Sequence, residues 1–345
     1  MKKEYIRPEY ENNNQLADVI LVSTIEENNK ITGIVDIEEL FGISGILFIT
    51  NHCFCSGFVF KISKIGVDME IIKDQRFDSE RALYESDGVH IVACAFQGEA
   101  DGESALKESK NIIAEKCLFD LRYPFWHDVG VEISGCEMTE KCRAPLWYTK
   151  EIKVSDTRLH GTKAIRECEN VKIKDCHIVS SELGWDSCYF NIENTYAEGE
   201  YMLSRAKNIS ARDFKMKGKY SFQYIENAVF ENCVLDTKDA FWHAKNVTVK
   251  NSVVKGEYLG WYSENITFEN CVITGTQPLC YCKGLRLINC QMHECDLAFE
   301  KSEVKAQITT PVISIKNVLS GKITVPCVGE IICDNESYKG IIEIK

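Results

Sequence analysis

The sequence is short of positive charge. Its 40 lysines and arginines stand against 52 aspartates and glutamates, which gives a net charge of −12 at pH 7. A nucleic-acid-binding protein needs a basic stripe to neutralise phosphates, and no such stripe is visible along this chain. The deficit therefore argues against nucleic acid as a partner. It also disfavours a polyanionic substrate, unless a cation bridges the substrate and the protein.

The sequence also lacks a secretory signal peptide. Residues 1–3 carry the expected positive charge, but residues 4–15 are polar where a signal peptide has its apolar stretch. Seventeen cysteines cannot all pair because the number is odd. Without an export signal, we expect free thiols and a cytoplasmic protein.

A metal-binding cysteine motif is missing as well. The pairs Cys53/Cys55 and Cys280/Cys282 lack the two-residue spacing and the nearby histidines of a zinc site. We therefore predict no metal centre and no cofactor from the cysteines.

What the chain does contain is a repeat of nineteen residues, and a period of this length is typical of solenoid proteins. Each copy reads Asn, apolar, any residue, apolar, any residue, Asn or Asp, small, any residue, apolar. From Ile152 to Val304 every step is nineteen residues, and small insertions precede Ile152. The first apolar residue of each copy, called the anchor below, is Val89, Ile112, Val131, Ile152, Val171, Phe190, Ile209, Ala228, Val247, Ile266, Leu285 or Val304.

The repeat predicts strands and excludes helices. The anchor and the residue two after it are apolar with a polar residue between them, which is the alternation of a β-strand. The positions five and seven after the anchor repeat this alternation. The Asn or Asp four after the anchor marks a corner, because these residues tolerate left-handed backbone. We predict an all-β fold, a single-stranded right-handed parallel β-helix of about twelve coils with three short strands per coil.

One cysteine column follows from this geometry. The residue five after the anchor is a cysteine in many copies and should face the interior as small apolar filler. The column holds Cys94, Cys117, Cys136, Cys176, Cys233, Cys271 and Cys290.

The two ends of the chain depart from the period. Residues 1–68 do not fit it, and we interpret them as an N-terminal extension or cap that covers an open sheet edge. The apolar run 40–60 leaves a membrane segment as an alternative, which Thr50, Asn51 and His52 at its centre disfavour. The β-helix should span residues 69–345, with terminal capping strands from about residue 304.

Two columns, five and four residues before the anchor, are the candidate ligand surface. The first column holds all five tryptophans of the chain. Lys107, Arg166 and Arg205 also lie in these columns and could hardly be buried in so thin a rod. We therefore place both columns on an outer wall and call them the outer stripe. Its predicted ligand-binding residues are Trp126, His127, Trp147, Tyr148, Trp185, Tyr224, Trp242, His243, Trp261 and Tyr262.

Aromatic faces beside charged groups are typical of a polysaccharide groove, so we predict an oligosaccharide or polysaccharide ligand. The densest acid–base neighbourhood is Arg166, Glu167, Asp186 and Arg205 around Trp185. Glu167 and Asp186 occupy the same column one coil apart. Two carboxylates so close could work as acid and base, as in a glycoside hydrolase or polysaccharide lyase, or share a Ca²⁺ ion.

A structural interpretation of the stripe competes with this one. Aromatic residues also stabilise β-helices by stacking on one another, and the acid–base pairs could be surface ion pairs. The chain would then be a scaffold or protein-interaction solenoid without a small ligand. The sequence leaves both interpretations open, together with the oligomeric state.

Four further motifs stand out in the sequence: Phe77–Tyr84 (FDSERALY), Leu106–Ile112 (LKESKNI), Tyr123–Trp126 (YPFW) and Leu259–Trp261 (LGW). They resemble motifs of a bacterial family, the domain of unknown function 3737 family. The resemblance covers about residues 69–345. It implies a pectin-lyase-like right-handed β-helix and no particular activity.

The wider superfamily contains pectate lyases and polygalacturonases, which raises the expectation of a carbohydrate ligand. The catalytic motifs do not carry over. The chain has no Asp-Asp pair and no Asn-Thr-Asp sequence, and His160-Gly161 is an isolated similarity to the polygalacturonase histidine motif. A fold shared with enzymes is a weak argument for catalysis.

Overall fold

The computed structural model describes residues 21–25, 30–36, 46–48, 69–99 and 102–345. The chain divides into two units, Met1–Met69 and Glu70–Lys345. In the first unit, β1 (Leu21–Ile25), β2 (Lys30–Asp36) and β3 (Ile46–Phe48) form an antiparallel sheet. The role of this unit as a cap stays a prediction. Cys53/Cys55 and most of the apolar run 40–60 lie outside the described residues.

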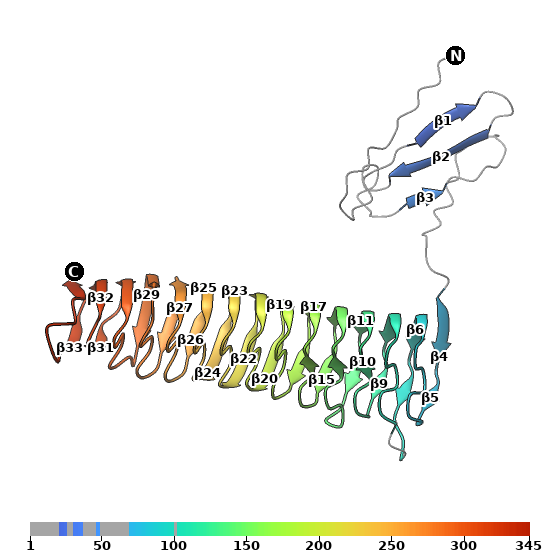
Figure 1. Cartoon of the computed structure of the whole chain (residues 1–345), viewed down its shortest axis with the longest axis horizontal. Coiled ribbons are helices and arrows are strands. Elements are labelled where there is room, and N and C mark those ends of the chain that lie inside the picture. The colour runs from blue at the N-terminus through green and yellow to red at the C-terminus, as the bar shows by residue number, and fades with distance from the viewer. Residues whose placement is uncertain (1–20, 26–29, 37–45, 49–68, 100–101) are drawn as a thin grey trace. The chain divides into compact units, whose positions relative to one another are not determined.

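The second unit is a stack of coils, each adding strands parallel to those of the coil before it (Figure 1). Val171 pairs with Phe190, and Phe190 pairs with Ile209, so the nineteen-residue step is the spacing of the coils. The predicted parallel β-helix is confirmed. The strands that begin near the anchors form sheet one: β4 (Glu70–Lys73), β6 (Asp87–Val92), β8 (Lys110–Glu115), β11 (Val129–Ser134), β14 (Lys150–Ser155), β17 (Glu169–Lys174), β19 (Cys188–Glu193), β21 (Lys207–Arg212), β23 (Glu226–Glu231), β25 (Lys245–Lys250), β27 (Glu264–Glu269), β29 (Leu285–His293), β30 (Glu303–Ile308), β32 (Ser320–Val325) and β34 (Ile341–Ile344).

Sheet two follows a corner in each coil. Its strands pair in parallel in the same order: β5 (Arg76–Phe77), β7 (Ala95–Phe96), β9 (Leu118–Phe119), β12 (Glu137–Met138), β15 (Arg158–His160), β18 (His177–Val179), β20 (Tyr196–Glu200), β22 (Lys215–Lys219), β24 (Val234–Lys238), β26 (Val253–Lys255), β28 (Val272–Thr274) and the end of β29. Strands β31 (Val312–Lys316) and β33 (Val328–Ile332) form a further parallel pair.

The prediction of three strands in every coil is wrong. A third sheet exists only as three two-residue strands, β10 (Phe125–Trp126), β13 (Leu146–Trp147) and β16 (Ile165–Arg166), among the described coils. Later coils have turns on this side because left-handed residues alternate there, as at Leu203 (φ 53°) and Arg205 (φ 61°). Such an alternation is incompatible with a strand, whose residues all have negative φ.

The solenoid has about fourteen turns rather than the predicted twelve. The extra coils come from the two ends of the repeat. Glu70 pairs with Val89, and Gly321 pairs with Val304, so both occupy anchor positions. Neither residue has a large apolar side chain, so these two coils do not match the repeat pattern. The strands from β30 onward therefore extend the stack as further coils.

The predicted Asn/Asp corner is confirmed. The residues four after the anchor have left-handed φ angles, for example 49° at Asp156, 42° at Asn194 and 52° at Asn270. Their side chains also bond from coil to coil: the Asn289 amide donates to Asn270 Oδ1 at 2.8 Å, and that of Asn270 donates to Asn251 Oδ1 at 3.2 Å. This ladder holds successive coils in register.

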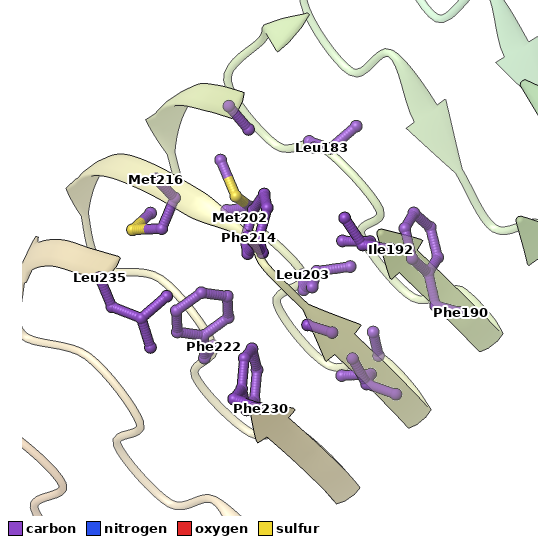
Figure 2. Close-up of a cluster of buried hydrophobic side chains, with 14 of the residues drawn as sticks. Leu183, Phe190, Ile192, Met202, Leu203, Phe214, Met216, Phe222, Phe230 and Leu235 are labelled. Carbon is purple, nitrogen blue, oxygen red and sulfur yellow. The ribbon is translucent and has the colours of Figure 1, made fainter. Parts of the chain in front are cut away.

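The core is one apolar column inside the coils. Anchors and the positions two, five and seven after them are buried throughout the regular coils, and large rings such as Phe190, Phe222 and Phe230 are almost completely enclosed (Figure 2). The predicted cysteine column is buried here as free thiols. Burial raises the pKa of Cys176 and Cys233 to about 11, so these thiols stay protonated at neutral pH. Cysteine therefore serves as core filler, as predicted.

Among the described residues, no helix has the length and hydropathy needed to cross a membrane.

Candidate functional site

The outer stripe lies on the turn side of the coils. Its first column includes the last residues of the short strands of sheet three, and its second column lies between these strands and the start of sheet one. The tryptophans Trp126, Trp147 and Trp185 are half-buried, whereas the residues that follow each of them are more exposed. The stripe is shorter than predicted. Cys280 and Phe299 continue the first column but are completely buried, so they belong to the core.

The second column of the stripe has left-handed backbone, which the sequence did not reveal. The φ angle is 63° at His127, 51° at Glu167 and 59° at Tyr224. Each of these residues donates its backbone N–H to the next coil, as Glu167 does to the Trp185 carbonyl at 2.8 Å. These inter-coil bonds offset the cost of left-handed backbone, which is about 1–2 kcal/mol for a residue with a Cβ.

Aromatic rings of the stripe stack on one another in two blocks. In the first, Trp126 lies 5.2 Å from Trp147 with an interplanar angle of 8°, and His127 lies 4.9 Å from Tyr148 at 11°. The second block has two parallel ladders. One joins Trp242 and Trp261, and the other consists, from coil to coil, of Tyr224, His243, Tyr262 and Tyr281.

This stacking changes how the blocks can meet a ligand. The spacing of the rings, near 5 Å, is the spacing of the coils, so each ring plane faces the ring of the next coil. Sugar rings cannot enter between them. In both blocks a ligand therefore reaches ring edges and hydroxyl groups, and not the flat ring faces on which a sugar was predicted to stack.

Replacing Trp242 with alanine should therefore destabilise the solenoid. The indole stacks on Trp261 at 5.4 Å and 5°, and its N–H donates to the Tyr258 carbonyl at 2.7 Å. We expect the free energy of unfolding to fall by about 2–3 kcal/mol and the melting temperature by several degrees. Circular dichroism melts check this. Tyr189→Ala, at an exposed ring outside the stripe, should leave the melting temperature nearly unchanged; equal melting of both variants would contradict the structural role.

Between the two blocks lies an interval of charged residues. The structure brings the four predicted catalytic residues together as two ion pairs: Arg166 Nε is 3.1 Å from Glu167 Oε1, and Arg205 Nε is 2.7 Å from Asp186 Oδ1. A hydrogen bond with Glu167 raises the pKa of Tyr148, so its hydroxyl stays protonated. Each carboxylate is held by an arginine.

Trp185 is the tryptophan of this interval and differs from the other four. Its indole has no parallel ring partner among the residues that the structure describes. The Arg166 guanidinium lies 5.7 Å from the ring centre, and Tyr201 approaches at 6.1 Å with a tilt of 48°. The next coil places the small, buried Ser204 in the same column. Trp185 therefore lacks the aromatic neighbour that covers rings in the two blocks.

The corner beside the stripe holds further residues that the repeat did not predict as part of a site. Tyr123, Arg143, Ala144 and Lys163 surround a cavity of about 170 Å³ together with Trp147 and Arg166. All four stand eight or nine residues before an anchor, where the repeat shows no common residue type, so no periodic signal marked them.

Two larger hollows lie away from the stripe. One, of about 560 Å³, is on the outer face of sheet one around Tyr189, Lys172 and Asn191. The other, of about 480 Å³, is at the Asn/Asp corner around Asp175, His177 and Tyr196. Neither hollow contains a residue of the outer stripe. In the described part of the chain, no group of three or more His, Cys, Asp or Glu side chains is arranged to hold a metal ion.

Stacked parallel coils and an inward cysteine column define the chain as a right-handed parallel β-helix protein. The chain belongs to the DUF3737 family, whose members are described as proteins of unknown function; the family model matches residues 70–344.

Solved structures with similar coils include the surface protein and adhesin PfbA of Streptococcus pneumoniae. It has 8% identity and a TM-score of 0.39, and the match covers 81% of this chain and 93% of PfbA. The A-module of the Azotobacter vinelandii mannuronan C-5 epimerase AlgE4 has 9% identity and a TM-score of 0.27, covering 79% and 87%. The tailspike of E. coli bacteriophage HK620 has 11% identity and a TM-score of 0.26, covering 76% and 71%. No curated protein matches the sequence.

Proposed function

We propose that this protein binds an oligosaccharide at the interval of the outer stripe, between the two aromatic blocks. The observation that carries the proposal is the environment of Trp185. It is the tryptophan without a parallel ring partner, and it lies among the ion-paired side chains of Arg166, Glu167, Asp186 and Arg205. An aromatic surface with a few directional polar groups is the composition of a small-ligand site.

The polar groups of the interval suit hydroxyl recognition. The guanidinium of Arg205 and the carboxylate of Asp186 are exposed, and each has bonding capacity beyond the single contact that joins them. A sugar offers hydroxyls that both donate and accept. We infer that the ligand lies across the interval, with one ring over the indole and hydroxyls on the ion pairs.

Binding is better supported than catalysis. A general acid must carry a proton, and burial without a cationic partner is the usual means of keeping a carboxyl protonated. Glu167 and Asp186 have the opposite environment, because each accepts a hydrogen bond from an arginine. We therefore propose a binding protein, with the two ion pairs as ligand contacts.

Trp185→Ala tests the proposal. Calorimetric titration of the full chain with a panel of neutral and acidic oligosaccharides should give at least one ligand that the wild type binds. For that ligand the variant should bind at least tenfold more weakly, because central tryptophans dominate binding free energies.

Trp261→Ala is the matched control. It removes an indole that stacks on Trp242 and whose N–H donates to the Gln277 carbonyl at 2.8 Å. It should lower stability and leave the affinity for the oligosaccharide within about twofold. Wild-type affinity in Trp185→Ala, or equal losses in both variants, would contradict a site at the interval.

A scaffold without a saccharide ligand is the second candidate. The parallel stacking within the two blocks favours it, since those rings already have partners. It predicts that the wild type binds nothing in the panel, while Trp242→Ala and Trp261→Ala still melt early.

A further inference from the structure

We infer that the cavity beside Trp147 binds the carboxylate group of an acidic sugar, so that the oligosaccharide carries a uronate. This inference rests on the proposed function and names the class of its ligand. The cavity adjoins the interval, because Arg166 lines the cavity and also lies 5.7 Å from the Trp185 ring.

The cavity has the size of a ligand group. Its volume of about 170 Å³ equals the share of roughly five or six water molecules in the liquid. Both aromatic rings and cationic side chains line it. Tyr123 lies 5.9 Å from Trp147, and the side chains of Arg143, Lys163 and Arg166 complete the lining.

The charges of the lining are not balanced. Lys163 Nζ and Arg166 Nη1 share one carboxylate, Glu182, at 3.3 and 3.0 Å, and Arg166 also contacts Glu167. Arg143 forms no ion pair with any described residue. Three cations thus meet two carboxylates, which leaves one positive charge in a protein whose net charge is −12. Arginine is the side chain that best matches a carboxylate, through two parallel hydrogen bonds.

The repeat itself provides an internal comparison. In two later coils the indole N–H donates to a corner carbonyl of the next coil: Trp242 to Tyr258 at 2.7 Å and Trp261 to Gln277 at 2.8 Å. The same bond is missing in the first block. The N–H groups of Trp126 and Trp147 are enclosed and have no acceptor within the described part of the chain.

The corner residues opposite these two indoles are Ala144 and Lys163, and both line the cavity. The cavity therefore lies at the corner that supplies the acceptor carbonyl to the indole in the later coils. A buried donor without a partner is rare in a folded protein. When the Tyr123 side chain moves aside, the oxygen atoms of a ligand here would accept hydrogen bonds from these indole N–H groups. Backbone carbonyls play that part in the later coils.

Arg143→Gln in the full chain tests the inference, with trigalacturonate and its methyl ester as the two probes. The ester differs from the acid in having no charged carboxylates. By calorimetric titration the wild type should bind the acid at least tenfold more tightly than the ester, and Arg143→Gln should remove most of that difference. Arg143 is exposed, so the variant should keep the wild-type melting temperature. Arg286→Gln, the same change at an exposed site on β29, should bind like the wild type.

The outcomes separate this inference from the proposed function. If both probes bind equally and Arg143→Gln leaves them unchanged, the carboxylate site is wrong while oligosaccharide binding stands. Equal losses in Arg143→Gln and Arg286→Gln would also overturn it, because they would indicate only a general effect of charge. If no saccharide of any charge binds the wild type, both proposals fail together.

Discussion

Replacing Asp128 with asparagine should make the solenoid more stable at neutral pH, by about 2–4 kcal/mol. Asp128 is completely buried three residues before the anchor Val131, in a column where neighbouring coils have Ser109 and Thr149. One carboxyl oxygen accepts the Ser109 backbone N–H at 2.9 Å, and the other has no partner. Burial raises the pKa of Asp128 to about 8.

The sign of the pH dependence follows from that shift. Between pH 4 and pH 8 the folded state keeps the Asp128 proton, whereas the unfolded chain releases it. Unfolding is therefore increasingly favoured as the pH rises, and the contribution of this group to stability is lost by about pH 8. Asparagine has no proton to release and should flatten the curve.

Urea denaturation from pH 5 to pH 8.5 measures this effect. Asp213→Asn is the control, because Asp213 is an exposed corner residue at a position where other coils have asparagine. It should follow the wild-type pH dependence. An Asp128→Asn variant that is less stable than the wild type at pH 8, or that keeps the wild-type slope, would contradict the assignment.

Replacing Gly218 with alanine should destabilise the protein by more than about 3 kcal/mol. Gly218 in β22 pairs with Gly199 in β20, one coil away. A Cβ at Gly218 would stand 1.9 Å from the Gly199 carbonyl oxygen. No rotamer relieves this contact because the obstacle is backbone, so the two coils must separate and lose the hydrogen bonds between them.

The measurement is again urea denaturation, with Lys217→Ala as the neighbouring control. Lys217 is exposed on the same strand and should cost less than about 0.5 kcal/mol. A Gly218→Ala protein as stable as the control would show that β20 and β22 adjust at this position without loss.

The sequence predicted the solenoid because its physical cause is periodic. The apolar anchors, the Asn/Asp corner and the cysteine column recur every nineteen residues, and stacking places like residues over like. Coils were missed where Glu70 and Gly321 occupy anchor positions. The prediction of a third strand in every coil was wrong because a hydrophobicity pattern does not reveal left-handed backbone at residues such as Leu203 and Arg205.

The candidate site was predictable only in part. The column positions identified the stripe and the proximity of Glu167 and Asp186 to arginines. They could not say that Trp126 stacks on Trp147 while Trp185 has no parallel partner, because that depends on side-chain direction within each coil. Arg143 and Lys163 escaped notice because the corner has no repeated residue type. The burial of Asp128 was not predicted because most other residues of its column are small and an aspartate is usually exposed.

The central claim is that an oligosaccharide binds over Trp185, and intrinsic tryptophan fluorescence of the full chain tests it most directly. The four other indoles belong to the stacked blocks, so a ligand at the interval should alter the emission of Trp185 above all. Titration with neutral and acidic oligosaccharides should give a saturable change in the wild type that disappears in Trp185→Ala. No response to any member of the panel would contradict the account and leave the aromatic stripe as a stabilising element of a scaffold.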